Sequence, residues 1–344
     1  MGRLSHKSIF EFSEITEGLV GMHSRLVKLE SCLALSLKDD VRSIGLWAMG
    51  GMGKSTLAKV AYKMISKEFD GCCFIEDVRK KDLFSLRKDL ISQISNATNL
   101  NIQNNLDGED MIKKLLRHNK VLLVLDDVDE SYKLTKLVKS DWFGSGSRII
   151  ITTRDRQLLI EFQVNEIFEV EGLTYKDALC LFCSKAFKNE QCPAEYLELS
   201  QRILEYANGL PSVLEVVGSF LFKRSIAEWE SALMMLQTDP KSKINQELKR
   251  NIDGLPDSVM SIFLDIACFF DHQPKDRVEE ILKCLGCNHV IGLNILIDKS
   301  ILKVTNNELW MHTLLRGMGR GIVREEYLNE SGKHRYQGSR GMSS

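Results

Sequence analysis

The fold of this chain is decided by the stretch Gly50-Gly51-Met52-Gly53-Lys54-Ser55-Thr56. Glycines at this density allow consecutive backbone N–H groups to turn toward one anion. Apolar residues then recur at helical spacing, namely Leu57, Ala58, Ala61, Met64 and Ile65. Because the N-terminal end of a helix dipole favours negative charge, we predict a phosphate-binding loop that leads into a helix.

Each part of this loop has an expected role in holding a nucleotide. The backbone N–H groups of residues 50–53 are expected to surround the phosphates. We expect Lys54 to reach the β- and γ-phosphates, Ser55 to ligate Mg²⁺, and Thr56 to contact the α- or β-phosphate. The first position of the loop pattern is Ala48 instead of glycine, which fits only if φ of this residue is negative.

A hydrophobic run that ends in two acids supports the same chemistry. Residues 121–125 read as a buried strand, and Asp126 and Asp127 follow directly. In phosphoryl-transfer sites, one carboxylate at such a strand end holds Mg²⁺ and a second orients the attacking water. We assign the first role to Asp126 and the second, catalytic role to Asp127. The alternative is that the two acids merely begin a loop.

Arg154 follows another predicted strand, so it is expected at the same carboxyl edge of the sheet. An arginine at this edge could sense the γ-phosphate. The alternative is a surface ion pair with Asp155 or Glu161. Together, the loop and the acidic strand predict that the chain binds ATP or ADP with Mg²⁺.

Short β-branched runs alternate with helical patterns from residue 42 to residue 170, which predicts a doubly wound parallel α/β sheet. The expected strands are Ser43–Trp47, Cys73–Asp77, Val121–Leu125, Arg148–Thr152 and Ile167–Val170. After Gly172 the pattern becomes helical. Thr174 and Asp177 form a capping box, and further helices are expected at Glu195–Ala207, Ser212–Phe222 and Glu228–Leu236.

The last part of the chain has a different pattern of apolar residues. Three helical patterns precede two short apolar runs, Ile301–Val304 and Leu309–Met311, which flank Asn306-Asn307. Helices followed by a hairpin predict a winged-helix unit. We therefore expect a leader at 1–18, a P-loop nucleotide-binding domain at 19–170, a helical bundle at 171–245, a winged-helix domain at 246–326 and a disordered tail at 327–344.

Composition limits the possible functions. With 46 basic and 47 acidic residues, the net charge of -1 gives no general attraction to nucleic acid or to anionic lipid. No run approaches the ~18 apolar residues of a membrane helix, and the N-terminus does not resemble a secretory signal. We therefore expect an intracellular protein in the cytoplasm, with the nucleus possible, that binds neither membranes nor DNA.

The ordered set of motifs resembles the NB-ARC nucleotide-binding domains of plant intracellular immune receptors. The resemblance covers nearly the whole chain, from Leu19-Val20-Gly21-Met22 to Met311-His312. Between these ends it includes the phosphate loop, Phe69 to Arg79, the acidic strand, Gly144 to Arg154, Gly209-Leu210-Pro211 and Phe263 to Phe270. Asp129 and the sequence from Phe263 to Phe270 resemble those of the subclass that usually carries an N-terminal TIR domain.

The resemblance implies a switch that is closed with ADP, and that opens and self-associates with ATP. It implies that the helical bundle and the winged helix are the ARC1-like and ARC2-like parts. Val20 would line the base pocket, Pro211 would pack on the adenine, and His312 would reach the β-phosphate of ADP. Without the resemblance, Pro211 reads as a helix start and His312 as a satisfied histidine at a strand end.

Several positions depart from the family pattern. Thr313 stands where the family has aspartate, so we expect a weaker hold on ADP. Gly317 and Gly321 replace acids in the final helix, which should fray because each glycine costs about 1 kcal/mol. No TIR-like domain precedes residue 19 and no leucine-rich repeat follows residue 326. We therefore expect the switch alone, whose partner would be a full-length receptor or a second copy.

Three functions remain in competition. The first is the ADP/ATP switch of defence signalling, which is at most a slow P-loop ATPase. The second is an ATPase-coupled winged-helix DNA-binding regulator, but residues 289–299 are mostly Val, Ile and Leu with one lysine and so read as core. The third is a degenerate scaffold that binds ADP without turnover.

Overall fold

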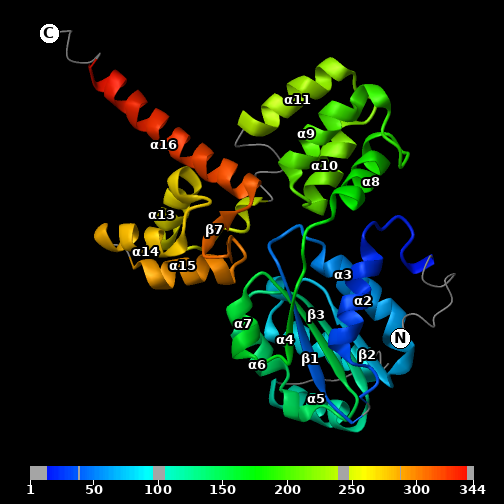
Figure 1. The fold of residues 1–344 in the computed structure, drawn as a ribbon. Helices are drawn as coiled ribbons and strands as arrows, with labels where there is room; N and C mark the ends of the chain where they lie inside the picture. The colour runs from blue at the N-terminus through cyan, green and yellow to red at the C-terminus, as the bar shows by residue number, and fades with distance from the viewer. Residues whose placement is uncertain (1–13, 38, 96–104, 239–247, 287, 339–344) are drawn as a thin grey trace. The chain divides into compact units, whose positions relative to one another are not determined.

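A computed structural model describes residues 14–37, 39–95, 105–238, 248–286 and 288–338. The chain divides into two compact units, Met1–Asp177 and Ala178–Ser344, shown in Figure 1. The first unit holds the predicted nucleotide-binding domain, and the second holds the helical bundle and the winged helix. Residues 1–13 of the expected leader and the expected boundary between 245 and 246 lie outside the described residues.

The first unit is built on a five-stranded parallel sheet, as predicted for a doubly wound α/β domain. Its strand order is β2-β3-β4-β1-β5. The strands are β1 (Arg42–Trp47), β2 (Gly71–Ile75), β3 (Val121–Val128), β4 (Arg148–Thr153) and β5 (Glu166–Glu169). The predicted end of β3 at Leu125 was too early, because a register shift between Leu125 and Val128 lets the strand continue through Asp126 and Asp127.

Helices cover both faces of this sheet because successive strand residues point to opposite sides. On one face, Leu122 and Val124 pack with α2 (Met22–Leu33) and α3 (Lys54–Ile65). On the other face, Leu123 and Leu125 pack with helices that follow later in the chain. These helices are α4 (Leu83–Ser95), α5 (Asn105–His118), α6 (Ser131–Leu137) and α7 (Arg156–Glu161). Short 3₁₀ turns lie at Ser66–Glu68, Val78–Lys80 and Ser140–Trp142.

A buried arginine fastens α2 to the sheet. Arg148, the first residue of β4, is only 1% exposed, and its guanidinium donates only to backbone carbonyls. Two of these carbonyls, those of Leu33 and Ala34, lie at the C-terminal end of α2, 2.6 and 2.8 Å away. The negative end of the helix dipole therefore stabilises the buried cation.

A bundle of four helices follows, and its first helix begins in the last residues of the first unit. The helices are α8 (Tyr175–Ala186), α9 (Leu197–Ala207), α10 (Pro211–Leu221) and α11 (Ile226–Thr238), with a 3₁₀ turn at Ala194–Tyr196. The predicted capping box is confirmed, because the Thr174 hydroxyl donates to Asp177 at 2.8 Å and accepts from its N–H at 3.3 Å. Trp229 is buried at the centre of the bundle and stacks on Phe187.

The winged helix follows with α13 (Asp257–Asp265), a π-helical turn (Ile266–Phe270), α14 (Lys275–Cys284), α15 (His289–Asp298), β6 (Leu302–Thr305), β7 (Glu308–Met311) and α16 (Thr313–Gly338). Asn306 and Asn307 have φ of 51° and 66°, the left-handed values that a two-residue hairpin needs. The prediction that residues 289–299 are core holds for Leu293 and Leu296, which are buried, but not for Val290 and Ile291, which are 57% and 59% exposed.

The final helix extends further than expected. The backbone of α16 is helical from Thr313 to Gly338, across Gly317 and Gly321 and into the expected tail, whose residues 339–344 lie outside the described residues. Residues 324–326, Arg-Glu-Glu, are good helix formers, and no proline interrupts the segment. Within the described parts of the chain, no helix combines the length and apolar character that crossing a membrane requires.

Candidate nucleotide-binding site

The glycine loop joins β1 to α3 at the carboxyl edge of the sheet. Gly51 and Gly53 have φ of 85° and 90°, which only glycine adopts easily. Ala48 occupies the position where the loop pattern has glycine. It is buried, and its φ is not positive. The alanine therefore fits the loop backbone, and the departure from the pattern carries no strain.

Lys54 lies inside the loop instead of reaching into solvent. Its Nζ donates to the backbone oxygens of Ala48 at 2.6 Å and of Met49 at 2.9 Å. Burial, and then the charge of Arg154, lower the pKa of the Lys54 ammonium to about 7, while Asp127 and Asp126 act in the opposite direction. These mutual effects mean that the structure brings the predicted lysine, arginine and both acids into one electrostatic environment.

One threonine organises the two acids. The hydroxyl of Thr152, on the adjacent strand β4, donates to Asp126 Oδ1 at 2.6 Å and accepts from the N–H of Asp127 at 2.9 Å. Asp127 has a left-handed φ of 55° where the register of β3 shifts. Thr152 was not among the predicted site residues, although it lies two positions before Arg154 within the Gly144–Arg154 motif.

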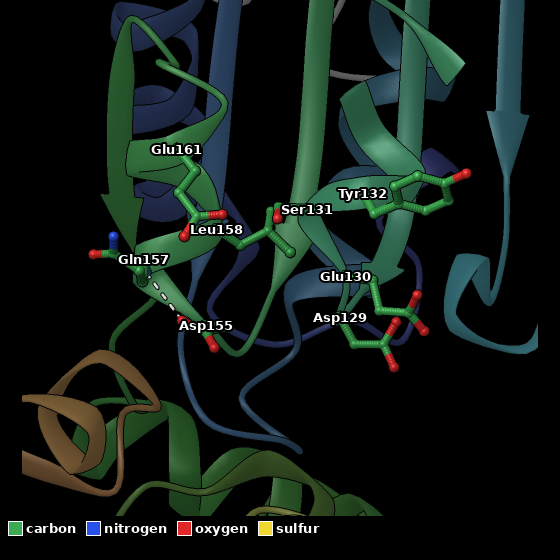
Figure 2. Close-up of a pocket in the computed structure, with 8 residues that line it drawn as sticks. All are labelled: Asp129, Glu130, Ser131, Tyr132, Asp155, Gln157, Leu158 and Glu161. Atoms are coloured by element: carbon green, nitrogen blue, oxygen red, sulfur yellow. Dashed lines mark hydrogen bonds between the residues drawn. The ribbon is translucent and has the colours of Figure 1, made fainter. Parts of the chain in front are cut away.

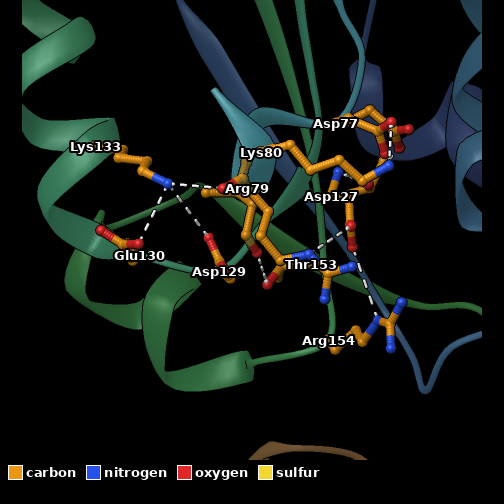
Figure 3. Close-up of polar contacts among 12 residues, drawn as sticks. Asp77, Arg79, Lys80, Asp127, Asp129, Glu130, Lys133, Thr153 and Arg154 are labelled. Atoms are coloured by element: carbon orange, nitrogen blue, oxygen red, sulfur yellow. Dashed lines mark hydrogen bonds and ion pairs between the residues drawn. The ribbon is translucent and has the colours of Figure 1, made fainter. Parts of the chain in front are cut away.

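Asp127 lies between two arginines, as Figure 3 shows. Its carboxylate is 3.3 Å from Nε of Arg79 and 3.7 Å from Nε of Arg154. Arg154 therefore pairs with Asp127, a partner that the sequence analysis had not considered. The backbone oxygen of Arg79 accepts from Lys133 Nζ at 2.9 Å, which holds Arg79 in place. In the sequence, Arg79 was noted only as the last residue of the Phe69–Arg79 motif, and its ion pair with Asp127 was not predicted.

A second arginine, which was also not predicted from the sequence, stabilises the phosphate loop. Arg25 on α2 donates to the Met52 oxygen at 3.3 Å and to the Glu171 oxygen at 2.6 Å, and burial lowers its pKa. It thus ties the phosphate loop to the segment that follows β5. Val20 is half-buried just before Gly21, and its contact with a base stays a prediction.

The second unit holds the two remaining predicted residues. Pro211 is the first residue of α10, a position that proline suits without any ligand. His312 is 2% exposed, and its Nδ1 accepts from the Leu314 N–H at 3.3 Å. Nε2 therefore carries the proton, and this buried atom has no hydrogen-bond partner among the described residues. The contact of His312 with a phosphate stays a prediction.

Burial lowers the pKa of His312 to about 4. The backbone of Asn208 offsets this effect in part, although it does not meet the geometry of a hydrogen bond to Nε2. A neutral imidazole with a buried, unpaired N–H is suited to an acceptor such as a phosphate oxygen.

These donors and acceptors fit a magnesium nucleotide. In the first unit, loop N–H groups and Lys54 suit phosphate oxygens, and the oxygens of Ser55 and Asp126 suit Mg²⁺; in the second unit, the His312 Nε2–H suits an anionic acceptor. No group of three or more His, Cys, Asp or Glu side chains suited to a metal occurs in the described ranges.

A separate pocket of about 370 Å³ lies beside α6 and α7 (Figure 2). It contains none of the predicted nucleotide-binding residues. Its lining includes four carboxylate side chains, those of Asp129, Glu130, Asp155 and Glu161. Such a lining repels a polyphosphate, so we place the nucleotide at the glycine loop and not in this pocket.

Comparison with known proteins shows the family to which the chain is related. Residues 28–192 match the NB-ARC domain, and residues 258–327 match the winged-helix domain described as Disease resistance protein Roq1-like. The chain is 38% identical over 321 residues to Disease resistance protein RUN1 of Vitis rotundifolia, covering 92% of this chain and 24% of the relative. It is 37% identical over 318 residues to TMV resistance protein N of Nicotiana glutinosa, covering 89% and 27%.

This chain thus spans about a quarter of the length of these relatives. Among solved structures, the Walker-type ATPase PABY2304 of Pyrococcus abyssi matches with a TM-score of 0.59 and 15% identity, covering 88% of this chain and 96% of that one. At this identity the match supports the fold alone, and the fold is that of a P-loop nucleotide-binding protein.

Proposed function

Because this chain belongs to the NB-ARC proteins related to plant disease resistance, we propose that it is an ADP/ATP switch of defence signalling. In this proposal the chain is closed with ADP and open with ATP, and the ATP form associates with a second copy or a full-length receptor. The observation that carries the proposal is the buried, unpaired Nε2–H of His312, in a chain that also has a complete phosphate loop.

The residues have distinct parts in the proposed switch. Backbone N–H groups of the loop and Lys54 bind the phosphates, while Ser55 and Asp126 hold Mg²⁺, which supplies positive charge when bound. His312 donates to the β-phosphate of ADP, Pro211 packs on the adenine and Val20 lines the base pocket. These contacts favour one arrangement of the chain only if ADP binds that arrangement more tightly than the other.

The pairing of Asp127 suggests that hydrolysis is slow. A carboxylate that orients an attacking water must accept a hydrogen bond from it, and nearby arginine charges make the carboxylate a weaker acceptor. Both oxygens of Asp127 face arginines, at 3.3 and 3.7 Å. The same observation favours the second candidate function, a scaffold that binds ADP without turnover, and a single-turnover measurement of ATP hydrolysis separates the two.

The proposal is tested by identifying the nucleotide in the purified chain and in the variant Lys54→Ala. We expect bound ADP in the wild type and a loss of affinity of roughly tenfold to a hundredfold in the variant, because a charge-assisted contact to phosphate is removed. Lys59→Ala is the matched control, since Lys59 lies on the same helix with an exposed side chain paired to Glu76. Wild-type protein that binds neither ADP nor ATP would contradict the proposal.

A further inference from the structure

A buried carboxylate holds the backbone on both sides of His312. The side chain of Asp271, which follows the π-helical turn, is 5% exposed. Its Oδ1 accepts from the N–H of Met311, the residue before His312, at 2.9 Å. Its Oδ2 pairs with Arg316 in the first turn of α16, after His312. One side chain therefore fixes both the strand that delivers His312 and the helix that leaves it.

Other contacts keep Asp271 itself in place. Its N–H donates to the Ile266 oxygen at 3.1 Å, which closes the π-helical turn. Arg320 on α16 donates to the Ala267 oxygen of the same turn at 2.9 Å. The N–H of His272 donates to the Leu309 oxygen on β7 at 2.8 Å. The turn, the hairpin and α16 thus form one connected frame around His312.

We propose that Asp271 is a positioning residue for His312, and that together with Arg316 it sets how firmly the imidazole is held for its phosphate partner. This inference rests on the proposed function of His312. It also revises what Thr313 implies. The family aspartate is missing at that position, but a carboxylate still anchors both flanks of the histidine. We therefore expect Thr313→Asp to change ADP retention by less than about threefold, because a single charge near the surface contributes little.

The test measures the dissociation rate of a fluorescent N-methylanthraniloyl-ADP from the full chain. The variants are His312→Ala, Asp271→Asn and the double variant. His312→Ala should release the ADP analogue roughly tenfold faster or more, because it removes a hydrogen bond to a charged group. Asp271→Asn should accelerate release by about fivefold, and the double variant should be no faster than His312→Ala, because coupled residues are not additive.

Asp276→Asn is the matched control. Asp276 also contacts the hairpin, accepting from Asn307 Nδ2 at 3.0 Å, but at the turn and not at His312. Its replacement should leave the release rate unchanged. Arg316→Lys, which keeps the charge but changes the geometry, replaces Asp271→Asn if that variant does not fold. Melting curves check the fold of each variant.

The outcomes separate this inference from the proposed function. If His312→Ala releases the ADP analogue at the wild-type rate, the proposed role of His312 fails, and this inference fails with it. If His312→Ala accelerates release but Asp271→Asn and Arg316→Lys both behave like Asp276→Asn, only the positioning role is overturned. An Asp271→Asn effect that adds fully to that of His312→Ala also overturns it, because Asp271 would then act independently of the histidine.

Discussion

Two buried sites, one in each unit of this chain, differ in how their polar side chains are satisfied. In the first unit, Arg148 and Lys54 are surrounded by backbone oxygens of their own unit. In the second unit, His312 is equally buried, but its Nε2 has no partner among the described residues. Arg148 and Lys54 are therefore satisfied by the backbone around them, whereas His312 keeps a donor that an external acceptor would satisfy.

The largest expected effect tests the satisfied side of this comparison. Arg148→Met removes every hydrogen bond of a buried guanidinium and leaves several buried carbonyls unpaired. We expect the first unit to lose about 4 kcal/mol or more of unfolding free energy, measured by urea denaturation. Arg156→Met, at an exposed position on α7, should change it by less than about 0.5 kcal/mol. A similar small loss for Arg148→Met would break the comparison.

The second prediction tests the buried, unpaired His312 through the pH dependence of the unfolding free energy. The pKa of His312 is lowered from 6.5 to about 4, so the unfolded chain binds the proton first as pH falls. Stability should therefore be lost between pH 6.5 and about 4, by an amount on the order of 3 kcal/mol. Unfolding curves of the wild type and His312→Gln at several pH values measure this. Equal pH slopes for the two proteins would show that His312 is not held neutral.

A smaller effect concerns the threonine between the two acids. Thr152→Val removes the acceptor of the Asp127 N–H and the donor to Asp126. We expect a loss of about 1–3 kcal/mol in unfolding free energy, together with weaker Mg²⁺-dependent nucleotide binding. Titration of nucleotide with and without Mg²⁺ measures the second change. Thr305→Val, at an exposed strand position, is the control, and equal behaviour of the two variants would remove Thr152 from the site.

The smallest expected effects on stability concern the packing of α16 in the second unit. A Cβ at Gly319 would lie 2.6 Å from Ala267 Cβ, whereas a Cβ at Gly317 would meet nothing within 4 Å. Gly319→Ala should therefore destabilise the protein by about 1–3 kcal/mol, and Gly317→Ala should stabilise it by up to about 1 kcal/mol. Melting temperatures compare the two variants. Shifts of the same sign would show that the turn at Ile266–Phe270 does not pack tightly against α16.

Much of the fold could be predicted because the relevant signals are local. The glycine loop, the Thr174–Asp177 capping box and the Asn306-Asn307 hairpin each specify backbone conformation within a few residues. The extent of α16 could not be predicted in the same way. Its tail lacks apolar periodicity, yet the helix continues on good helix formers.

The sequence by itself determined the parallel sheet, its phosphate loop and the candidates Lys54, Asp126 and Asp127, because glycine spacing and strand patterns act over short distances, whereas His312 was a candidate only through the family resemblance. Only the tertiary structure decided what these side chains touch. Arg79 meets Asp127, and Asp271 anchors the flanks of His312, across gaps of about forty residues or more that no local pattern spans. Such pairings arise when strands and helices pack, so they emerge only after the chain has folded.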